Sequence, residues 1–277
     1  MQILKIMALG ATLTLAFGAG AAETLQVKEF KGTPSYVLHV GDSLTYYNCG
    51  MNAWLNGFVK EKQDKKFASR IATIGGLGTH YAPVEEYLDN TLNRAHREKA
   101  PEAVLKAEKE FIAKKRYDTV ILQVQRFGQK FAERDEFYIA QHAKAIRQYG
   151  ATPVILLPFI SKATNAHGQL PCSLEEVTAT TIHTANKVNA YVIPAGIAFA
   201  NAEKAVPTLN FYMPDKRHPV GAGSYVVAAT IYAALFKKHP SEAIGFEGAC
   251  EKTIPQDLRK TLCEVAWKTC KEFYGWK

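Results

Sequence analysis

The sequence predicts an α/β protein, a three-layer αβα sandwich around a central, mostly parallel sheet. Short β-branched apolar runs alternate along the chain with longer helical patterns, and this alternation is typical of a parallel sheet covered by helices. No low-complexity linker, internal repeat or break in composition divides the chain. We therefore expect residues 23–277 to form a single domain, which a chain of 277 residues is long enough to build around one core.

The expected strands are short apolar runs that end at glycine or polar residues. They cover residues 36–40, 67–74, 119–124, 152–157 and 190–193. The first run stops at Gly41, and the second leads into Gly75 and Gly76. Because glycine favours turns, each of these two strands is expected to end in a tight turn.

The expected helices lie between and after these strands and show the 3.6-residue spacing of apolar positions. They cover residues 45–61, 84–99, 101–115, 133–149, 174–189, 220–238 and 255–273. Pro101 suits a first helical position, and Gly150 suits the end of a helix. Residues 161–172 carry loop residues, and Pro194 with Gly196 predicts a turn.

The first 22 residues have the composition of a signal peptide. A single charge at Lys5 precedes an apolar run over residues 6–17, and small residues follow up to Ala22. The run is short for a membrane span, and no later stretch approaches the roughly 20 apolar residues that a spanning helix needs. The sequence therefore predicts a periplasmic or secreted protein without stable membrane insertion.

Five cysteines follow the predicted leader, and an oxidising compartment would allow some to pair. They are Cys49, Cys172, Cys250, Cys263 and Cys270. Cys263 and Cys270 are seven residues apart on an expected helix and so share one face. Cys250 precedes that helix and is able to pair with either one, which would pin the C-terminal helix. The odd count leaves at least one thiol free, and the connectivity stays open.

The net charge of +8 is mostly balanced locally. Lysines alternate with acidic residues over 60–66 and 106–116, as on a solvated helix face. No stripe of arginines interleaved with aromatics is present, so the sequence predicts no nucleic-acid partner. It also has no CxxC pair and no Gly-rich nucleotide pattern, and we therefore expect no metal, nucleotide or flavin cofactor.

In an open parallel sheet, ligands bind beyond the carboxyl ends of the strands. The first such turn is Gly41-Asp42-Ser43-Leu44, where a hydroxyl lies between a strand and a helix. Ser43 has two interpretations: an N-cap that satisfies a helix amide, or a nucleophile held beside amides that stabilise an oxyanion.

A serine nucleophile requires a base, and the base requires a group that orients it. Asp215 stands three residues before His218, in a polar segment just ahead of a long expected helix. This spacing lets the carboxylate fold back onto the imidazole and set its tautomer. Taken alone, the pair is more typical of helix capping and a salt bridge than of catalysis.

In combination, these motifs resemble the GDSL/SGNH hydrolases over most of the chain that follows the leader. The similar segments are Gly41 to Asn48, Gly75 to His80, Val120 to Gln125, Pro194 to Gly196 and His218 to Tyr225. The resemblance implies a flavodoxin-like fold and a serine esterase, of an exported bacterial branch, that works through an acyl-enzyme.

The resemblance also implies roles for individual residues. Ser43 would be the nucleophile, His218 the general base and then acid, and Asp215 its orienting carboxylate. The amides of Ser43 and Gly76 would donate to the oxyanion. The family's Gly-x-Asn-Asp is absent, so a third donor would come from Gln123 or Gln125, of which we favour Gln125 as nearer the strand end; a buried structural Gln is the alternative.

Several neighbouring side chains have simpler interpretations than catalysis. We expect His39 to be a hydrogen-bonded core histidine, His80 to bind backbone in its loop, and Trp54 to lie in the core. Tyr46, Tyr47 and Asn48 would either border the substrate or pack, and nothing near Cys49 would activate its thiol.

The predicted substrate is an ester, with an O-acetyl group on a carbohydrate as the specific hypothesis. Two alternatives remain: an O-acyltransferase that uses the same three residues, and a non-catalytic binding protein on the same fold. The sequence leaves the natural substrate open.

Overall fold

A five-stranded sheet forms the centre of the structure, a computed structural model, and every strand in it runs parallel to its neighbours. The structure describes residues 23–32, 34–62, 67–75, 81–89, 101–114, 116–124, 132–168 and 170–277. The strand order is β2-β1-β3-β4-β5. The strands are β1 (Tyr36–Gly41), β2 (Ala68–Thr73), β3 (Thr119–Gln123), β4 (Thr152–Leu156) and β5 (Tyr191–Ile193). The parallel sheet predicted from the sequence is confirmed.

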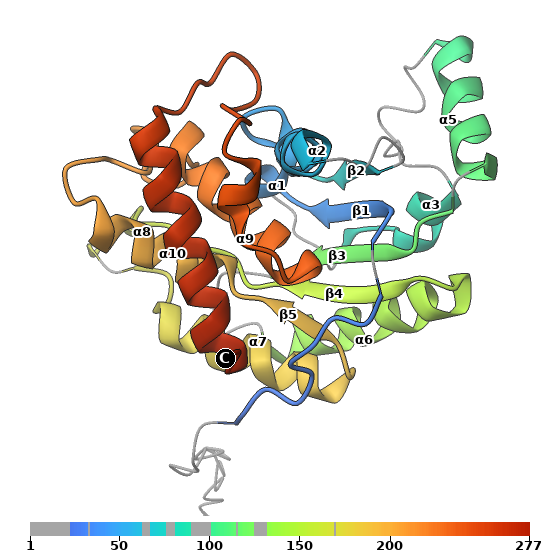
Figure 1. Cartoon of the computed structure of the whole chain (residues 1–277). Coiled ribbons are helices and arrows are strands. Elements are labelled where there is room, and N and C mark those ends of the chain that lie inside the picture. Colours follow the sequence, from blue (N-terminus) through green and yellow to red (C-terminus); the bar gives the residue numbers. More distant parts are fainter. Residues whose placement is uncertain are drawn as a thin grey trace, which may run out of the picture.

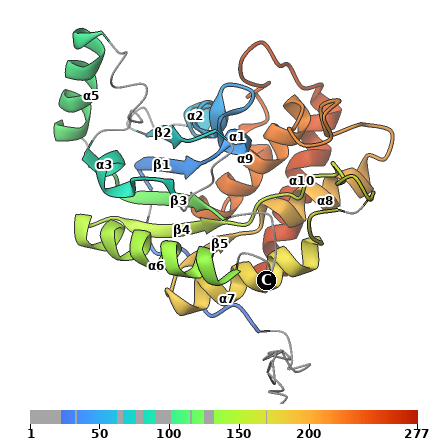
Figure 2. The ribbon, with the colours of Figure 1, turned by 180° about the vertical axis from the view of Figure 1, so that it is seen from behind.

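Helices cover both faces of this sheet. On one face lie α2 (Gly50–Lys62), α8 (Ala195–Ala205), α9 (Gly221–Phe236) and α10 (Gln256–Tyr274), which Figure 1 shows in front of the sheet and above it. On the other lie α6 (Ala132–Tyr149), α7 (Leu174–Lys187) and the short α3 (Val84–Asp89), seen in Figure 2. Helix α5 (Glu102–Lys114) projects at the periphery (Figure 1). The result is the predicted three-layer αβα sandwich.

Helix α9 is buried all round, because residues 222–235 are all buried between the sheet and the neighbouring helices. A helix without a polar face has to lie inside the molecule. Its N-terminus follows directly on the segment that carries His218. A helix that is buried on all sides therefore anchors one side of the candidate site. None of the described helices has the length and apolar character needed to cross a membrane.

Two expectations about helices were wrong. The helix predicted over 45–61 is divided into α1 (Ser43–Tyr46) and α2, because Asn48, Cys49 and Gly50 have positive φ angles of 51°, 71° and 80° and such angles end a right-handed helix. The turn predicted at Pro194 and Gly196 is the start of α8. Residues 90–99 of the predicted helix over 84–99 lie outside the described residues.

The predicted pairing of Cys250 was also wrong. Cys250 is bonded to Cys49, with 5.9 Å between their Cα atoms, and not to either cysteine of α10. Cys263 and Cys270 are fully buried free thiols against α9, whereas Cys250 lies in an exposed loop beside the turn that carries Cys49. Cys172 is also buried. Burial raises the pKa of the Cys263 thiol to about 11, so this cysteine stays protonated.

His39 lies on the central strand β1 and is 1% exposed, as expected for a core residue. Contrary to expectation, neither ring nitrogen has a hydrogen-bond partner among the described residues. Burial away from water disfavours the charged ring and lowers the pKa of His39 to about 3, from 6.5 for a free imidazole.

We predict that His39 makes the protein sensitive to acid. The unfolded chain binds a proton at this residue below pH 6.5, whereas the folded chain binds it only near pH 3. Stability is therefore complete above pH 6.5 and falls as the pH drops toward 3, by about 1.4 kcal/mol per pH unit from this group. Between pH 7 and pH 4, the unfolding free energy measured with denaturant should fall less for His39→Leu than for wild type. Parallel curves of unfolding free energy against pH would refute this, because all other titrating groups are common to both proteins.

Candidate active site

Ser43 lies at the carboxyl end of β1, as the first residue of α1. Strand β1 has β2 on one side and β3 on the other. The chain passes from β1 to β2 on one side and then crosses back to β3 on the other side. Such a point, where the strand order switches, opens a crevice in an α/β sheet. Ser43 is therefore at the position where this fold places its ligands.

Asp42, and not Ser43, caps helix α1. The Asp42 Oδ1 atom accepts hydrogen bonds from the Leu44 amide at 2.9 Å and from the Gln123 side-chain amide at 2.8 Å. The Thr45 hydroxyl donates to Gln123 Oε1 at 2.6 Å. The capping interpretation of Ser43 was therefore wrong. Its hydroxyl is not used to hold the helix.

Gly41 allows this network to form. A Cβ atom at position 41 would lie 2.2 Å from Thr45 Oγ1 and 2.8 Å from Gln123 Oε1, which is inside the contact distance of real atoms. Only a glycine thus lets β3 and the start of α1 approach each other closely enough to bond. The carboxamide of Gln123 is committed to this network, which corresponds to the buried structural Gln considered in the sequence analysis.

A narrow turn between α8 and α9 carries Asp215 and His218; we call residues 212–219 the histidine turn. Residues Tyr212 and Pro219 form an isolated antiparallel bridge, and the Met213 amide donates to the His218 carbonyl at 2.8 Å. Lys216, at the tip, has a φ of 55°, and its carbonyl accepts from the Lys162 amide at 2.8 Å. The turn is therefore attached to the segment that follows β4.

These two parts of the chain bring Ser43, His218 and Asp215 into a continuous hydrogen-bonded series. His218 Nε2 lies 2.8 Å from Ser43 Oγ, although the residues are 175 positions apart in the sequence. On the other side of the ring, His218 Nδ1 lies 2.5 Å from Asp215 Oδ2. Because an ionised carboxylate only accepts, Nδ1 carries the proton and Nε2 is free to accept from the Ser43 hydroxyl.

Asp215 is held in its ionised form. Its slight desolvation raises the pKa, but hydrogen bonds from the backbone amides of His218 and Arg217, together with the His218 ring, outweigh this and lower the pKa to about 2. The Asp215 side chain is 45% exposed, whereas that of His218 is 14% exposed. The carboxylate therefore remains charged at neutral pH and approaches the ring from the solvent side.

Some predicted site residues cannot be placed. Gly76, His80 and Gln125 lie outside the described residues, so the oxyanion roles of Gly76 and Gln125 stay predictions, as does that of the Ser43 amide. Trp54 is fully buried, which confirms it as a core residue. In the described part of the chain, no three His, Cys, Asp or Glu side chains are grouped as a metal site would require.

Contacts of Tyr47 and Asn48 with the histidine turn were not expected. The sequence analysis placed these side chains beside the substrate or in packing, but Tyr47 lies flat against the His218 ring and Asn48 binds the carbonyl of Pro219. No local pattern predicts either contact, because both join segments some 170 residues apart.

Neither a family model nor a curated protein sequence matches this chain. Solved structures do match it. A DUF4886 family protein from Bacteroides uniformis has a TM-score of 0.55 and 15% identity, covering 88% of this chain and 96% of that one. A "putative GDSL-like lipase" from Parabacteroides merdae has a TM-score of 0.50 and 14% identity, covering 78% and 100%.

A third similar structure is an acetylxylan esterase from Geobacillus stearothermophilus, with a TM-score of 0.48, 14% identity, and coverage of 74% of this chain and 95% of that one. Identities this low establish architecture and not chemistry. The parallel sheet, its helical layers and the likeness to the GDSL-like structure lead to one conclusion: this chain has the fold of the GDSL/SGNH hydrolases.

Proposed function

We propose that this protein is a serine esterase that hydrolyses its substrate through an acyl-enzyme. The observation that carries the proposal is the hydrogen-bonded series from Ser43 Oγ through the His218 ring to the Asp215 carboxylate, with distances of 2.8 and 2.5 Å. A nucleophile, a base and a group that orients the base are the parts that acyl transfer by serine requires.

In this reaction His218 Nε2 takes the proton of Ser43 as the oxygen attacks the ester carbonyl. The imidazolium that forms is stabilised by Asp215, which stays ionised because its pKa is about 2. His218 then gives the proton to the departing alcohol, leaving an acyl group on Ser43. Water enters, loses a proton to the same ring nitrogen and releases the acid.

The negative charge on the carbonyl oxygen needs amide donors. We propose the backbone amides of Ser43 and Gly76 and the side chain of Gln125, where the family's Asn would stand. Each such donor is worth about 3 kcal/mol of transition-state stabilisation. The assignment is testable, because Gln125→Leu should lower kcat by about 10²-fold with little change in KM.

We further propose an exported protein that acts on a small acyl group, such as acetyl on a carbohydrate. The exposed Cys49–Cys250 disulfide supports export, since such bonds persist in oxidising compartments. The Tyr46 ring, 42% exposed and three residues after Ser43 on α1, offers a face on which a sugar ring can stack.

The first experiment is labelling of the purified protein by a fluorophosphonate probe, together with turnover of p-nitrophenyl acetate, butyrate and octanoate and of acetylated xylo-oligosaccharides. We expect labelling, and turnover that is fastest with acetate. Faster release from octanoate would contradict the small acyl group. A folded protein that neither reacts with the probe nor releases p-nitrophenol would instead be a binding protein. Transfer of acetyl to an added alcohol in preference to water would identify an acyltransferase.

A further inference from the structure

The two residues that directly follow helix α1 contact two consecutive residues of the histidine turn. Tyr47 contacts His218, and Asn48 contacts Pro219. Neither Tyr47 nor Asn48 supplies the nucleophile, the base or the carboxylate that orients the base. They do connect the part of the chain that carries the nucleophile with the part that carries the base.

The contact between Tyr47 and His218 is a parallel stack. The ring centroids are 3.9 Å apart, and the ring planes differ by 11°. Tyr47 is itself bound to the nucleophile, because its backbone amide donates to the Ser43 carbonyl at 3.0 Å. The His218 ring therefore lies against a surface whose position is set by Ser43.

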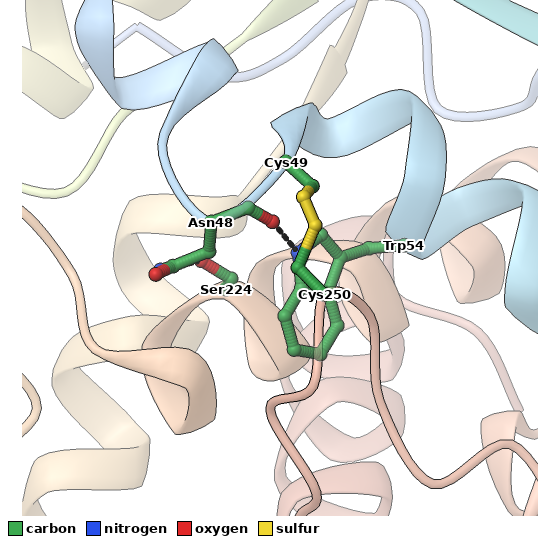
Figure 3. Close-up of a disulfide and its surroundings, with 5 residues drawn as sticks. All are labelled: Asn48, Cys49, Trp54, Ser224 and Cys250. Atoms are coloured by element: carbon green, nitrogen blue, oxygen red, sulfur yellow. Dashed lines mark hydrogen bonds between the residues drawn. A yellow bond between two sulfur atoms is a disulfide. The ribbon is translucent and has the colours of Figure 1, made fainter.

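Asn48 connects to the next residue of the same turn. Its side-chain amide donates to the Pro219 carbonyl at 2.9 Å and to the Ser224 hydroxyl oxygen at 2.8 Å. The backbone carbonyl of Asn48 accepts a hydrogen bond from the Trp54 indole at 2.7 Å. Figure 3 shows Asn48 between Ser224 and the Trp54 ring. Both side-chain partners lie at the start of α9, so Asn48 joins the end of α1 to the buried helix.

The backbone around Asn48 is held in a conformation that it would not adopt freely. Asn48 and Cys49 have φ angles of 51° and 71°; asparagine tolerates this region, but cysteine rarely enters it. The disulfide from Cys49 to Cys250 and the Trp54 hydrogen bond fix the segment there (Figure 3). Unfavourable backbone of this kind persists only where the surroundings impose it, and it concentrates at functional sites.

We propose that Tyr47 and Asn48 are positioning residues for the base, which keep the His218 ring aligned with Ser43. The inference rests on the proposed esterase function and adds to it. Asp215 restrains the ring at one nitrogen only, and from an exposed side chain. Tyr47 prevents the ring from tilting, and Asn48 prevents the turn from moving away from α1. The Tyr47 ring face also favours the imidazolium that forms when His218 takes the proton of Ser43.

Two pairs of variants separate these effects from general packing. Tyr47→Leu removes the aromatic face, and Tyr47→Phe keeps it. Asn48→Gly removes the side-chain amide but tolerates the positive φ, which an alanine would not. Asn56→Ala is the matched control, because the Asn56 side chain also holds backbone, accepting from the Ser69 amide at 2.9 Å, but on α2 away from His218.

With p-nitrophenyl acetate we expect kcat to fall about tenfold in Tyr47→Leu and to stay near wild type in Tyr47→Phe. Asn48→Gly should lower kcat by roughly ten- to a hundredfold, because small displacements of a catalytic group carry such losses. KM should change little in all variants. Asn56→Ala should lower the Tm but not kcat.

A second readout does not depend on turnover. The proton between His218 Nδ1 and Asp215 should give a low-field NMR resonance in wild type and Asn56→Ala that weakens in Tyr47→Leu and Asn48→Gly. Wild-type kcat and an unchanged resonance in both folded variants would overturn the inference. If wild type itself neither turns over ester nor reacts with a fluorophosphonate, the esterase proposal fails, while the resonance still tests the positioning of His218.

Discussion

Replacing Ser43 by alanine is expected to lower kcat for ester hydrolysis by about 10⁴- to 10⁶-fold, and replacing His218 by alanine should do nearly the same. The two changes remove the ends of one 2.8 Å hydrogen bond along which the proton moves. Because neither residue works without the other, the double variant should be no slower than the single ones. The measurement is single-turnover and steady-state release of p-nitrophenol from the acetate.

The Ser43 variant should also fold normally, which makes the kinetic result easy to interpret. Helix α1 is capped by Asp42 through the Leu44 amide, so loss of the Ser43 hydroxyl leaves the cap intact. Equal Tm values for wild type and Ser43→Ala would support this point. Residual activity within tenfold of wild type in folded Ser43→Ala would exclude Ser43 as the nucleophile.

The second large effect concerns stability and comes from the Cys49–Cys250 disulfide. The bond links residues 201 positions apart, and closing so long a loop removes much of the freedom of the unfolded chain. We expect the Cys49→Ser/Cys250→Ser variant to lose about 3 to 5 kcal/mol of unfolding free energy. At this chain size the loss corresponds to a fall in Tm of roughly 10 to 15 °C.

Reductant provides the matched control for the disulfide. The Tm of wild type in dithiothreitol should fall toward that of the double variant, because both sulfurs belong to exposed residues and the reductant can reach them. The Tm of the double variant should not respond to dithiothreitol, since Cys49–Cys250 is the one disulfide in the described part of the chain. An equal fall in the Tm of both proteins would show that dithiothreitol does not act through this disulfide. Esterase activity of the double variant, measured below its lowered Tm, would show whether the disulfide is needed to keep residues 48 and 49 in place.

Much of the fold follows from local pattern. The sequence predicted all five strands to within one residue at either end. A strand buried along its whole length, such as β3, leaves a nearly uninterrupted apolar run in the sequence. Helix boundaries were less certain. The break after Tyr46 was missed because a positive φ at Cys49 has no signature in residue type alone. Helix α8 was missed because Pro194 and Gly196, at its start, are typical of a turn.

The sequence by itself determined the fold class and the reactive groups. These groups are a serine after the first strand and an Asp-x-x-His before the long buried helix α9, in a chain whose pattern predicts a parallel sheet. Only the tertiary structure decided which groups meet. It brought His218 to Ser43 across 175 residues, joined Cys250 to Cys49 instead of to α10, and occupied Gln123 with Asp42. The reason is physical: local pattern reflects which face of an element is buried, whereas contacts between distant segments depend on how the three layers pack together.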